Sequence, residues 1–316
     1  YTIVFNGEIY NFKDLKKELS EYPFQSESDT EVILAAWNRW GEAACSKLNG
    51  MFAFALWDKE EESLFLGRDS TGVKPLYYYF DGTRLIFSSE IKGVLEAGIP
   101  RVLNQDALQH YLRLMYVPAP MTMFQGVSKL LPGRLLKLTG SKLTINEFRG
   151  VWRGVEAPTG ERESAELLHS TLHDAVSRQM VSDRPIGLYL SGGIDSSILA
   201  SIASKVNPRI DTYTVGYDLE EGEEHEKFNA DKELANRTAA HFGTTHHEYD
   251  LSSAEALSLF KETVRYLDEP IGNATAISQL YLARQVKETA TVVLSGDGGD
   301  ELFGGYERYR LAHLAH

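Results

Sequence analysis

The sequence predicts two domains of different class, an antiparallel α+β domain followed by an α/β domain built on a parallel sheet. Up to about residue 145, strand-like runs follow one another across short turns, a pattern typical of antiparallel sheets. From about residue 165, β-branched runs alternate with helical segments, as in parallel sheets that helices cover on both faces. A chain of 316 residues with 43% hydrophobic content is long enough for two cores.

The first domain is expected to start within a strand at Tyr1. Ser28 and Glu31 have the spacing of a capping box, and the apolar residues that follow recur at helical intervals. Asp81-Gly82 favours a tight hairpin turn in which both central residues have positive φ. The remaining elements expected here are strands over 51–58, 63–69, 75–80 and 84–90, a helix over 104–115 and a hairpin over 131–145.

A linker is expected between Arg149 and Glu163, where the chain is glycine-rich, charged and aperiodic. We place the boundary near Pro158, which gives domains of residues 1–157 and 158–316. The acidic run Asp218–Glu226 is expected to be a solvated loop. The second domain is expected to contain helices over 165–181, 196–206 and 230–242, two more before residue 291, and strands over 185–190, 210–217, 246–251 and 291–294.

Composition argues against several classes of protein. The formal net charge of −13 disfavours a nucleic-acid partner, because binding to phosphates requires positive charge. No apolar run approaches the roughly 20 residues that span a bilayer, and the first residues do not resemble a signal peptide. A single cysteine, Cys45, excludes an internal disulfide and fits a reducing, cytoplasmic compartment. It lies in an apolar stretch, so we expect it in a core.

The stretch LYLSGGIDSSILA (188–200) is a strand that ends at two glycines and continues at once as a helix. Gly192 and Gly193 allow consecutive N–H groups to converge on an anion, and the helix adds the positive end of its dipole. Ser191, Ser196 and Ser197 supply hydroxyl donors. The lysine of the common phosphate-binding loop is missing. The alternative is a strand-to-helix turn that only needs glycines and a serine cap.

A second glycine-rich segment, SGDGGDELFGGY (295–306), follows the strand expected at 291–294. Asp297, Asp300 and Glu301 repel one another unless a cation lies among them, and Mg²⁺ prefers oxygen ligands shared with phosphates. Ligands of parallel sheets bind at the carboxyl ends of the strands, where both segments belong. Asp195 and Asp300 are the expected Mg²⁺ ligands. The alternative is a solvated acidic turn, which explains the charges but not the glycines.

Together these two segments resemble the ATP-pyrophosphatase class, and the second is similar to glutamine-dependent asparagine synthetases. The first domain resembles the glutaminase domain of class II amidotransferases in five motifs: VFNGEIYNF (4–12), SESDTEVIL (26–34), LNGMFAFALWD (48–58), GRDSTGVKPLYYY (67–79) and FSSEIK (87–92). The resemblance implies a truncated αββα sandwich of the amino-terminal-nucleophile hydrolase type, followed by an ATP-pyrophosphatase domain.

In the first domain, the resemblance implies that Asn6 and Gly7 form an oxyanion hole and that Glu8 and Asp29 help bind glutamine. Without the family context, Asn6-Gly7 reads as a hairpin turn and Asp29 as a first-turn acidic residue. Arg68, Asp69 and Lys74 are expected to tie strands together.

In the second domain, the resemblance implies that the first loop clamps the β and γ phosphates of ATP. Asp297 stands where many members carry a glutamate that assists acyl-adenylate chemistry. His246 and His247 are adjacent on a strand and point to opposite faces, so we expect structural roles rather than a shared metal. The ATP-binding residues implied are Leu190, Ser191, Gly192, Gly193, Asp195, Ser196, Val215, Ser295 and Gly296.

The implied activity is glutamine-dependent asparagine synthesis with ATP and Mg²⁺, in which aspartate is adenylated and ammonia from glutamine displaces AMP. Two alternatives stay open: a related amidotransferase with another carboxylate acceptor, and an inactive regulator that binds nucleotide or glutamine. Residue 1 is tyrosine where the family carries its nucleophilic cysteine, so we expect a chain that lacks its amino-terminal and carboxyl-terminal parts and does not hydrolyse glutamine as written. Oligomeric state is open, with a homodimer among the options.

Overall fold

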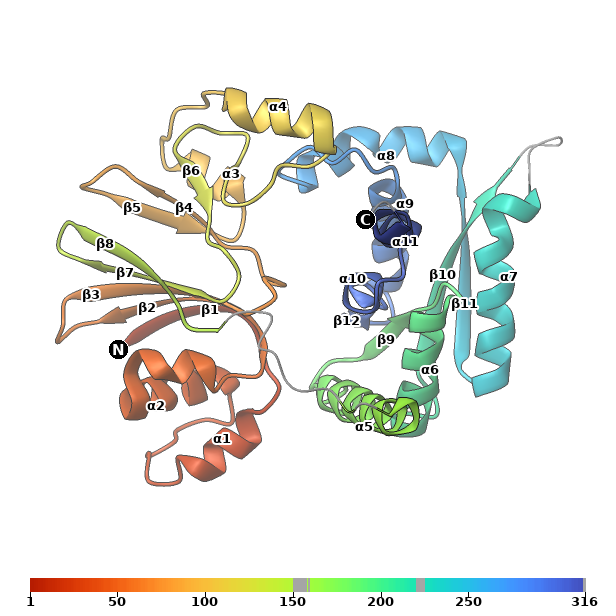
Figure 1. Ribbon diagram of the computed structural model, residues 1–316, viewed down its shortest axis with the longest axis horizontal. Coiled ribbons are helices and arrows are strands. Elements are labelled where there is room, and N and C mark those ends of the chain that lie inside the picture. Colours follow the sequence, from red (N-terminus) through yellow and green to blue (C-terminus); the bar gives the residue numbers. More distant parts are fainter. Residues whose placement is uncertain (150–157, 159, 220–224, 315–316) are drawn as a thin grey trace. The chain divides into compact units, whose positions relative to one another are not determined.

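The computed structural model describes residues 1–149, 158, 160–219 and 225–314 (Figure 1). Tertiary contacts divide the chain into two units, one of Tyr1–Glu156 with Val264–Asn273 and one of Ala157–Thr263 with Ala274–His316. A single boundary near Pro158 does not anticipate that residues 264–273 belong with the first unit. Most of the predicted linker (150–157 and 159) and part of the predicted acidic loop (220–224) lie outside the described residues.

Two antiparallel sheets form the first unit, with strand orders β1-β2-β3-β7-β8 and β5-β4-β6. The strands are β1 Thr2–Ile9, β2 Gly50–Asp58, β3 Ser63–Arg68, β4 Tyr77–Phe80, β5 Leu85–Ser88, β6 Val127–Lys129, β7 Arg134–Thr139 and β8 Lys142–Glu147. The helices are α1 Phe12–Glu18, α2 Asp29–Trp40, a 3-10 helix Gly41–Ser46, α3 Ile91–Glu96 and α4 Gln105–Leu114. The predicted strands, the helix over 104–115 and the hairpin over 131–145 are confirmed.

Strand β2 shows how side-chain alternation builds the layers of this unit. Phe52 and Phe54 lie in a core with α1 and α2 on one side of the larger sheet. Ala53 and Ala55 face the opposite side and lie in a core with residues that flank and form the smaller sheet. The outer face of the smaller sheet is covered by α3. The resulting order is helices, sheet, sheet, helix.

The β4–β5 hairpin differs from the prediction. Phe80 pairs with Leu85, so four residues rather than two form the loop. Of the predicted turn pair, only Gly82 has a positive φ, of 91°. The Asp81 carboxylate instead accepts hydrogen bonds from the N–H groups of Thr83, at 3.0 Å, and Arg84, at 2.8 Å. These bonds add to the backbone hydrogen bond from the Asp81 N–H to the Arg84 carbonyl, at 3.3 Å, and the prediction that both Asp81 and Gly82 have positive φ is wrong.

Helix α2 has the predicted serine cap but not the predicted capping box. The Ser28 hydroxyl accepts a hydrogen bond from the Thr30 N–H at 3.2 Å. The Glu31 carboxylate does not return to Ser28; it accepts from the N–H groups of Gln25, at 2.8 Å, and Ser26, at 2.7 Å. Glu31 thus holds the segment before the helix, and Ser28 alone caps the helix.

The second unit contains one parallel sheet, as predicted, and its strand order is β11-β10-β9-β12. Its strands are β9 Ile186–Tyr189, β10 Asp211–Asp218, β11 Thr245–Ser252 and β12 Val292–Leu294. Its helices are α5 Glu161–Gln179, α6 Ile194–Val206, α7 His225–Phe242, most of α8 (Ser253–Tyr266), α9 Thr275–Val286, α10 Gly299–Phe303 and α11 Glu307–Leu314. Among the helices that the structure describes, none has the length and apolar character needed to cross a bilayer.

The order of the strands places a topological switch point between β9 and β12. From β9 the chain adds β10 and β11 on one side, and then β12 on the other, with Leu188 opposite Leu294. Helices α5, α6 and α7 pack against one face of the sheet and α9 against the other (Figure 1). In sheets of this kind ligands bind at the switch point, outside the carboxyl ends of the strands.

Candidate functional site

A cavity of about 860 Å³ lies at the carboxyl ends of β9, β10 and β12, within the second unit. Both predicted loops contribute to its wall, at residues 191–196 and 295–300. The predicted residues that line it are Leu190, Ser191, Gly193, Asp195, Ser196, Val215, Ser295, Gly296, Asp297 and Asp300. The structure therefore brings together residues that are more than one hundred positions apart in the sequence.

Gly192 has a different place from the other predicted loop residues. Its φ is +75°, and a Cβ there would lie 2.4 Å from the Cβ of Leu234 in α7. It packs against α7 instead of lining the cavity. Only glycine adopts this positive φ readily and also leaves room for Leu234. The sharp turn at Gly192 directs the chain from β9 into α6.

Hydroxyl groups hold the first loop in shape. The hydroxyls of Ser191 and the buried Ser196 lie 3.0 Å apart. Ser191 Oγ also accepts from the Gly193 N–H at 3.3 Å, and Ser196 Oγ donates to the Gly193 carbonyl at 3.2 Å. Within the described residues no side chain caps the amino terminus of α6. Its first-turn N–H groups at Ile194 and Asp195 lack intrahelical acceptors, and both residues line the cavity, so an anion there would face a positive helix end.

The two loops meet at Asp195. A Cβ on Gly296 would lie 3.1 Å from the Cβ of Asp195, and a Cβ on Gly299 would lie 2.5 Å from its Oδ2. The glycines of the second loop thus allow the loop to close over this carboxylate. Asp297 accepts a hydrogen bond from the Ser295 hydroxyl at 3.0 Å. This close approach to Asp195 explains why the second loop needs glycines, whereas a solvated acidic turn would not require them.

The charge of the cavity is entirely negative. Its described lining contains Asp195, Asp231, Asp297 and Asp300, and no lysine, arginine or histidine. The described residues contain no cluster of three or more side chains able to hold a metal ion by themselves. A polyphosphate would therefore need a divalent cation to offset the carboxylates, and the cation would need phosphate oxygens to complete its shell. The donor set fits Mg²⁺ bound together with a phosphate chain.

Three tyrosines in the cavity wall were not predicted from the sequence: Tyr189, Tyr213 and Tyr217. The Tyr217 hydroxyl lies 3.1 Å from that of Ser278 and so ties β10 to α9. Burial, with a contribution from Asp297, raises the pKa of Tyr189. Thr275, Ser278 and Gln279 of α9 complete this wall. No local motif marks these positions.

In the first unit, Asn6 and Gly7 lie inside β1, so the reading as a hairpin turn is wrong. The Asn6 side-chain amide donates to the Ser89 hydroxyl at 3.1 Å. A Cβ on Gly7 would lie 2.1 Å from the Met51 carbonyl oxygen, so β2 approaches β1 as closely as glycine allows. These contacts fix the two predicted oxyanion-hole residues in an extended backbone.

Asp29 lies next to the same strand. Its Oδ2 accepts a hydrogen bond from the Ile9 N–H at 3.0 Å, which attaches the start of α2 to the end of β1 beside Glu8. The four residues predicted to bind glutamine therefore lie on one strand and on the helix end that contacts it.

Arg68 and Asp69 have the predicted structural roles. The Arg68 guanidinium donates to the carbonyls of Lys74, Leu130 and Gly72. Asp69 is fully buried and accepts from the N–H groups of Phe52, Thr71, Val73 and Lys74. In these contacts Lys74 contributes its backbone only.

The two histidines and the cysteine are also structural. His247 Nε2 lies 2.8 Å from Asp211, and the imidazole stacks on Tyr213, whereas His246 Nδ1 lies 2.9 Å from the Thr212 hydroxyl. The two imidazoles therefore have separate partners on the two faces of the strand. Cys45 is buried, and burial raises the pKa of its thiol to about 12.

Comparisons with known proteins agree with these two units. Residues 1–149 match the family model of a glutamine amidotransferase domain, and residues 167–316 that of asparagine synthase. The chain is 37% identical over 314 residues to glutamine-hydrolyzing asparagine synthetase 1 of Bacillus subtilis, covering 98% of this chain and 48% of that protein. It is 34% identical over 331 residues to synthetase 3 of the same organism, covering 99% of this chain and 53% of that one.

A fungal relative is named differently. Amidase chry2 of Gibberella zeae is 30% identical over 336 residues, covering 99% of this chain and 48% of that protein. The chain spans about half the length of the curated relatives it matches.

Proposed function

Because this chain belongs to the glutamine-hydrolysing asparagine synthetase family, we propose that it takes part in the ATP-driven conversion of aspartate to asparagine, with nitrogen from glutamine. The first unit is the glutaminase part and the second is the synthetase part. One observation carries the proposal above all: two glycine-containing loops meet at Asp195, at the switch point of a parallel sheet, beside an uncapped helix terminus.

The finer fold assignment is part of this proposal. The first unit has the αββα layers expected of an amino-terminal-nucleophile hydrolase, and its cores between helices and sheets support that assignment. The second unit has the parallel sheet and the two strand-end loops expected of an ATP-pyrophosphatase.

In the synthetase step, the first-turn N–H groups of α6 bind the β and γ phosphates of ATP, and Asp195 and Asp300 are the residues that would hold Mg²⁺. A bound Mg²⁺ neutralises phosphate charge, which the four carboxylates of the cavity cannot do. A carboxylate oxygen of aspartate attacks the α-phosphorus, the bond to the β-phosphate oxygen breaks, and pyrophosphate leaves. The product of this step is β-aspartyl-AMP. Leu190, Val215, Ser295 and Gly296 contact the adenosine.

Asp297 lines the same cavity. It is oriented by the Ser295 hydroxyl and lies beside Tyr189. We assign it to the formation or breakdown of the adenylate, in which ammonia attacks the acyl carbon and AMP leaves.

In the glutaminase step, the Asn6 amide and the Gly7 N–H stabilise the oxyanion that forms when the amide carbon of glutamine is attacked. Asp29 pairs with the α-amino group of glutamine, and Glu8 helps to bind it. The hydrogen bonds of Asn6 to Ser89 and of Asp29 to Ile9 support this, because they orient both side chains before glutamine binds.

A second candidate is the same chemistry with another carboxylate acceptor. The relative named amidase chry2, at 30% identity, supports keeping it, because that protein carries a different activity in its name. Both candidates use the same ATP cavity and differ only in the acid that is adenylated.

Product analysis of the full-length protein tests the proposal. With ATP, Mg²⁺, glutamine and aspartate we expect asparagine, glutamate, AMP and pyrophosphate, and Asp195→Ala should abolish AMP formation. Release of ADP and phosphate instead would contradict the adenylation mechanism. AMP and pyrophosphate that form with other acids but not with aspartate would favour the second candidate.

A further inference from the structure

A short segment of the chain returns from the second unit to the first. Residues Val264–Asn273, which we name the strap, belong to the first unit, although the residues before and after them belong to the second. The chain enters the strap from α8 and leaves it into α9.

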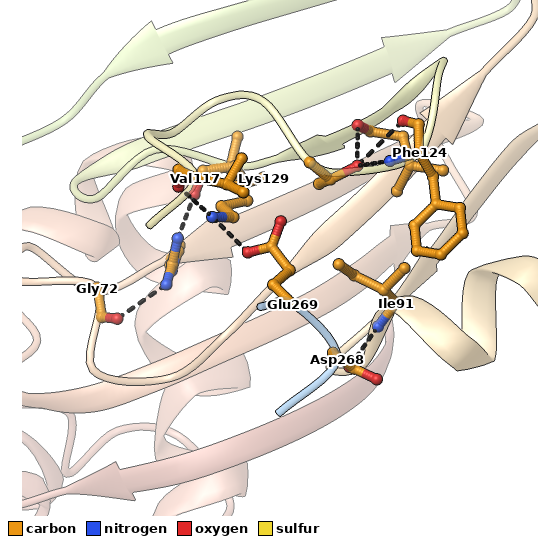
Figure 2. A network of polar contacts seen from close by, with 11 residues as sticks. Gly72, Ile91, Val117, Phe124, Lys129, Asp268 and Glu269 are labelled. Carbon is orange, nitrogen blue, oxygen red and sulfur yellow. Dashed lines mark hydrogen bonds and ion pairs between the residues drawn. The ribbon is translucent and has the colours of Figure 1, made fainter. Parts of the chain in front are cut away.

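Asp268 attaches the strap to α3 (Figure 2). Its Oδ2 accepts from the Ile91 N–H at 2.7 Å, and its Oδ1 accepts from Lys92 Nζ at 3.0 Å. The residue that precedes α3, Glu90, makes no side-chain cap, so Asp268 caps this helix from 177 positions away. Its side chain is 9% exposed and its φ is +58°, an uncommon value for a residue other than glycine.

Glu269 makes a second attachment. Its Oε2 lies 2.6 Å from Lys129 Nζ, and the two side chains are only 11% and 15% exposed. Lys129 also donates to the Val117 carbonyl at 2.9 Å, as Figure 2 shows. Burial raises the pKa of Glu269, while Lys129 opposes the rise. Loss of one partner from such a desolvated pair leaves an uncompensated buried charge, so the pair strongly favours one position of the strap.

The carboxyl end of the strap is attached through Gly272. Its N–H donates to the Met115 carbonyl at 2.8 Å. A Cβ on Gly272 would lie 2.5 Å from the Cβ of Met115, so the backbone of the strap lies directly on the end of α4. The strap is thus held in its middle, at Asp268 and Glu269, and near its carboxyl end, at Gly272.

The next element of the chain forms part of the nucleotide cavity. Ala274 follows the strap and precedes α9, whose Thr275, Ser278 and Gln279 line the cavity. The cavity wall at the amino end of α9 therefore begins two residues after the strap.

We propose that Asp268 and Glu269 are positioning residues for the nucleotide cavity: by fixing the strap to the first unit, they hold the first turn of α9 in the cavity wall. This inference rests on the proposed function only in taking the ligand to be ATP. On this account, order in the strap supports nucleotide binding through α9, the helix that follows it in the chain.

The test compares variants of the full-length protein. Glu269→Gln removes the buried charge with little change of shape, and Asp268→Asn does the same for the α3 cap. Arg101→Gln is the matched control, because the Arg101–Glu96 pair of the same unit is 65% and 75% exposed and contributes little. The measurements are hydrogen exchange of residues 264–273 and 275–279, the dissociation constant of MgATP, and kcat and KM with ammonia as nitrogen donor.

We expect faster exchange in both segments and a dissociation constant for MgATP raised about three- to thirty-fold in the Asp268 and Glu269 variants, the range of coupling through contiguous residues. The KM for ATP should change more than kcat. Arg101→Gln should leave both the exchange rates and the dissociation constant of MgATP unchanged. If Glu269→Gln does not fold, Lys92→Met, which keeps the Ile91 hydrogen bond and the Glu269–Lys129 pair, should give a smaller change in the same direction.

Two results would overturn the inference. One is faster exchange in 264–273 with unchanged exchange in 275–279 and unchanged affinity, which would make the strap merely structural. The other is an equal change in Arg101→Gln. If wild type does not bind MgATP, the proposed function fails, whereas the exchange of 275–279 still decides whether the strap positions α9.

Discussion

Gly299 lies so close to the carboxylate of Asp195 that a Cβ at position 299 would come 2.5 Å from Oδ2. Gly299→Ala should therefore displace this carboxylate from its place between the loops. We expect the affinity for MgATP to fall about tenfold or more, equivalent to about 1.4 kcal/mol. Isothermal titration of the purified variant measures it.

Gly160→Ala is the control for this change, because at Gly160 the nearest atom to a new Cβ lies 3.8 Å away. It should bind MgATP as wild type does. Unchanged affinity in Gly299→Ala would mean that Asp195 does not contact the bound nucleotide–metal complex.

Gly192→Ala should destabilise the second unit. The residue has a φ of +75°, and the new Cβ would lie 2.4 Å from that of Leu234. Backbone strain and overpacking together should cost about 2 to 4 kcal/mol of unfolding free energy, measured by urea denaturation. The neighbouring Gly193→Ala has no positive φ and meets only Ser191 Oγ, at 3.4 Å, so it should cost less than about 1 kcal/mol. Equal losses in the two variants would contradict the geometry.

Cys45 should be unreactive while the first unit is folded. Burial raises the pKa of its thiol to about 12, so at pH 8 almost no thiolate is present, and the side chain is 1% exposed. Alkylation by iodoacetamide should be slow in buffer and fast in urea, with the rate measured by mass spectrometry. Labelling of the folded protein at the rate of a free thiol would show that the site opens readily.

His246 should make the second unit less stable in mild acid. Burial lowers the pKa of His246 from its ordinary value of 6.5. Glu248 raises this pKa in part, whereas His247 lowers it further. The unfolded chain therefore binds more protons as the pH falls below about 6.5, and the unfolding free energy falls by at most about 1.4 kcal/mol per pH unit from this group. His246→Gln should flatten the slope of stability against pH between 5 and 7.

The exposed His169 of α5 is the control for this prediction. His169→Gln should keep the wild-type slope, as both variants retain the His247–Asp211 pair. A slope unchanged in His246→Gln would assign the acid sensitivity to another group.

Most strands and helices of the fold were predictable, because the apolar period of each element and the turn residues at its ends lie close together in the sequence. The alternation of Phe52, Ala53 and Phe54 marks a strand buried on both faces, and turn residues mark its ends. Among the elements that were missed, strand β6 and helix α3 have three and six residues, which are too few to show a period. The Asp81 turn was wrongly predicted because the Asp81 carboxylate accepts from the backbone of the turn, and Asp81 itself does not need a positive φ.

The residues of the candidate site also include some that the sequence predicts and some that it does not. Its loops were predictable, because glycines, serines and aspartates crowd into two short segments at strand ends. The tyrosines and α9 were not, because they reach the cavity only through the packing of distant elements. The strap could not be predicted either: Asp268 and Ile91 are 177 residues apart, and neither has a pattern that names its partner.

The most direct test of the central claim is a crystal structure of the full-length protein with ATP and Mg²⁺. The account predicts the triphosphate at the amino end of α6, between residues 191–197 and 295–300, with Mg²⁺ on Asp195 and Asp300. A triphosphate bound elsewhere, with these two loops free of nucleotide, would contradict it.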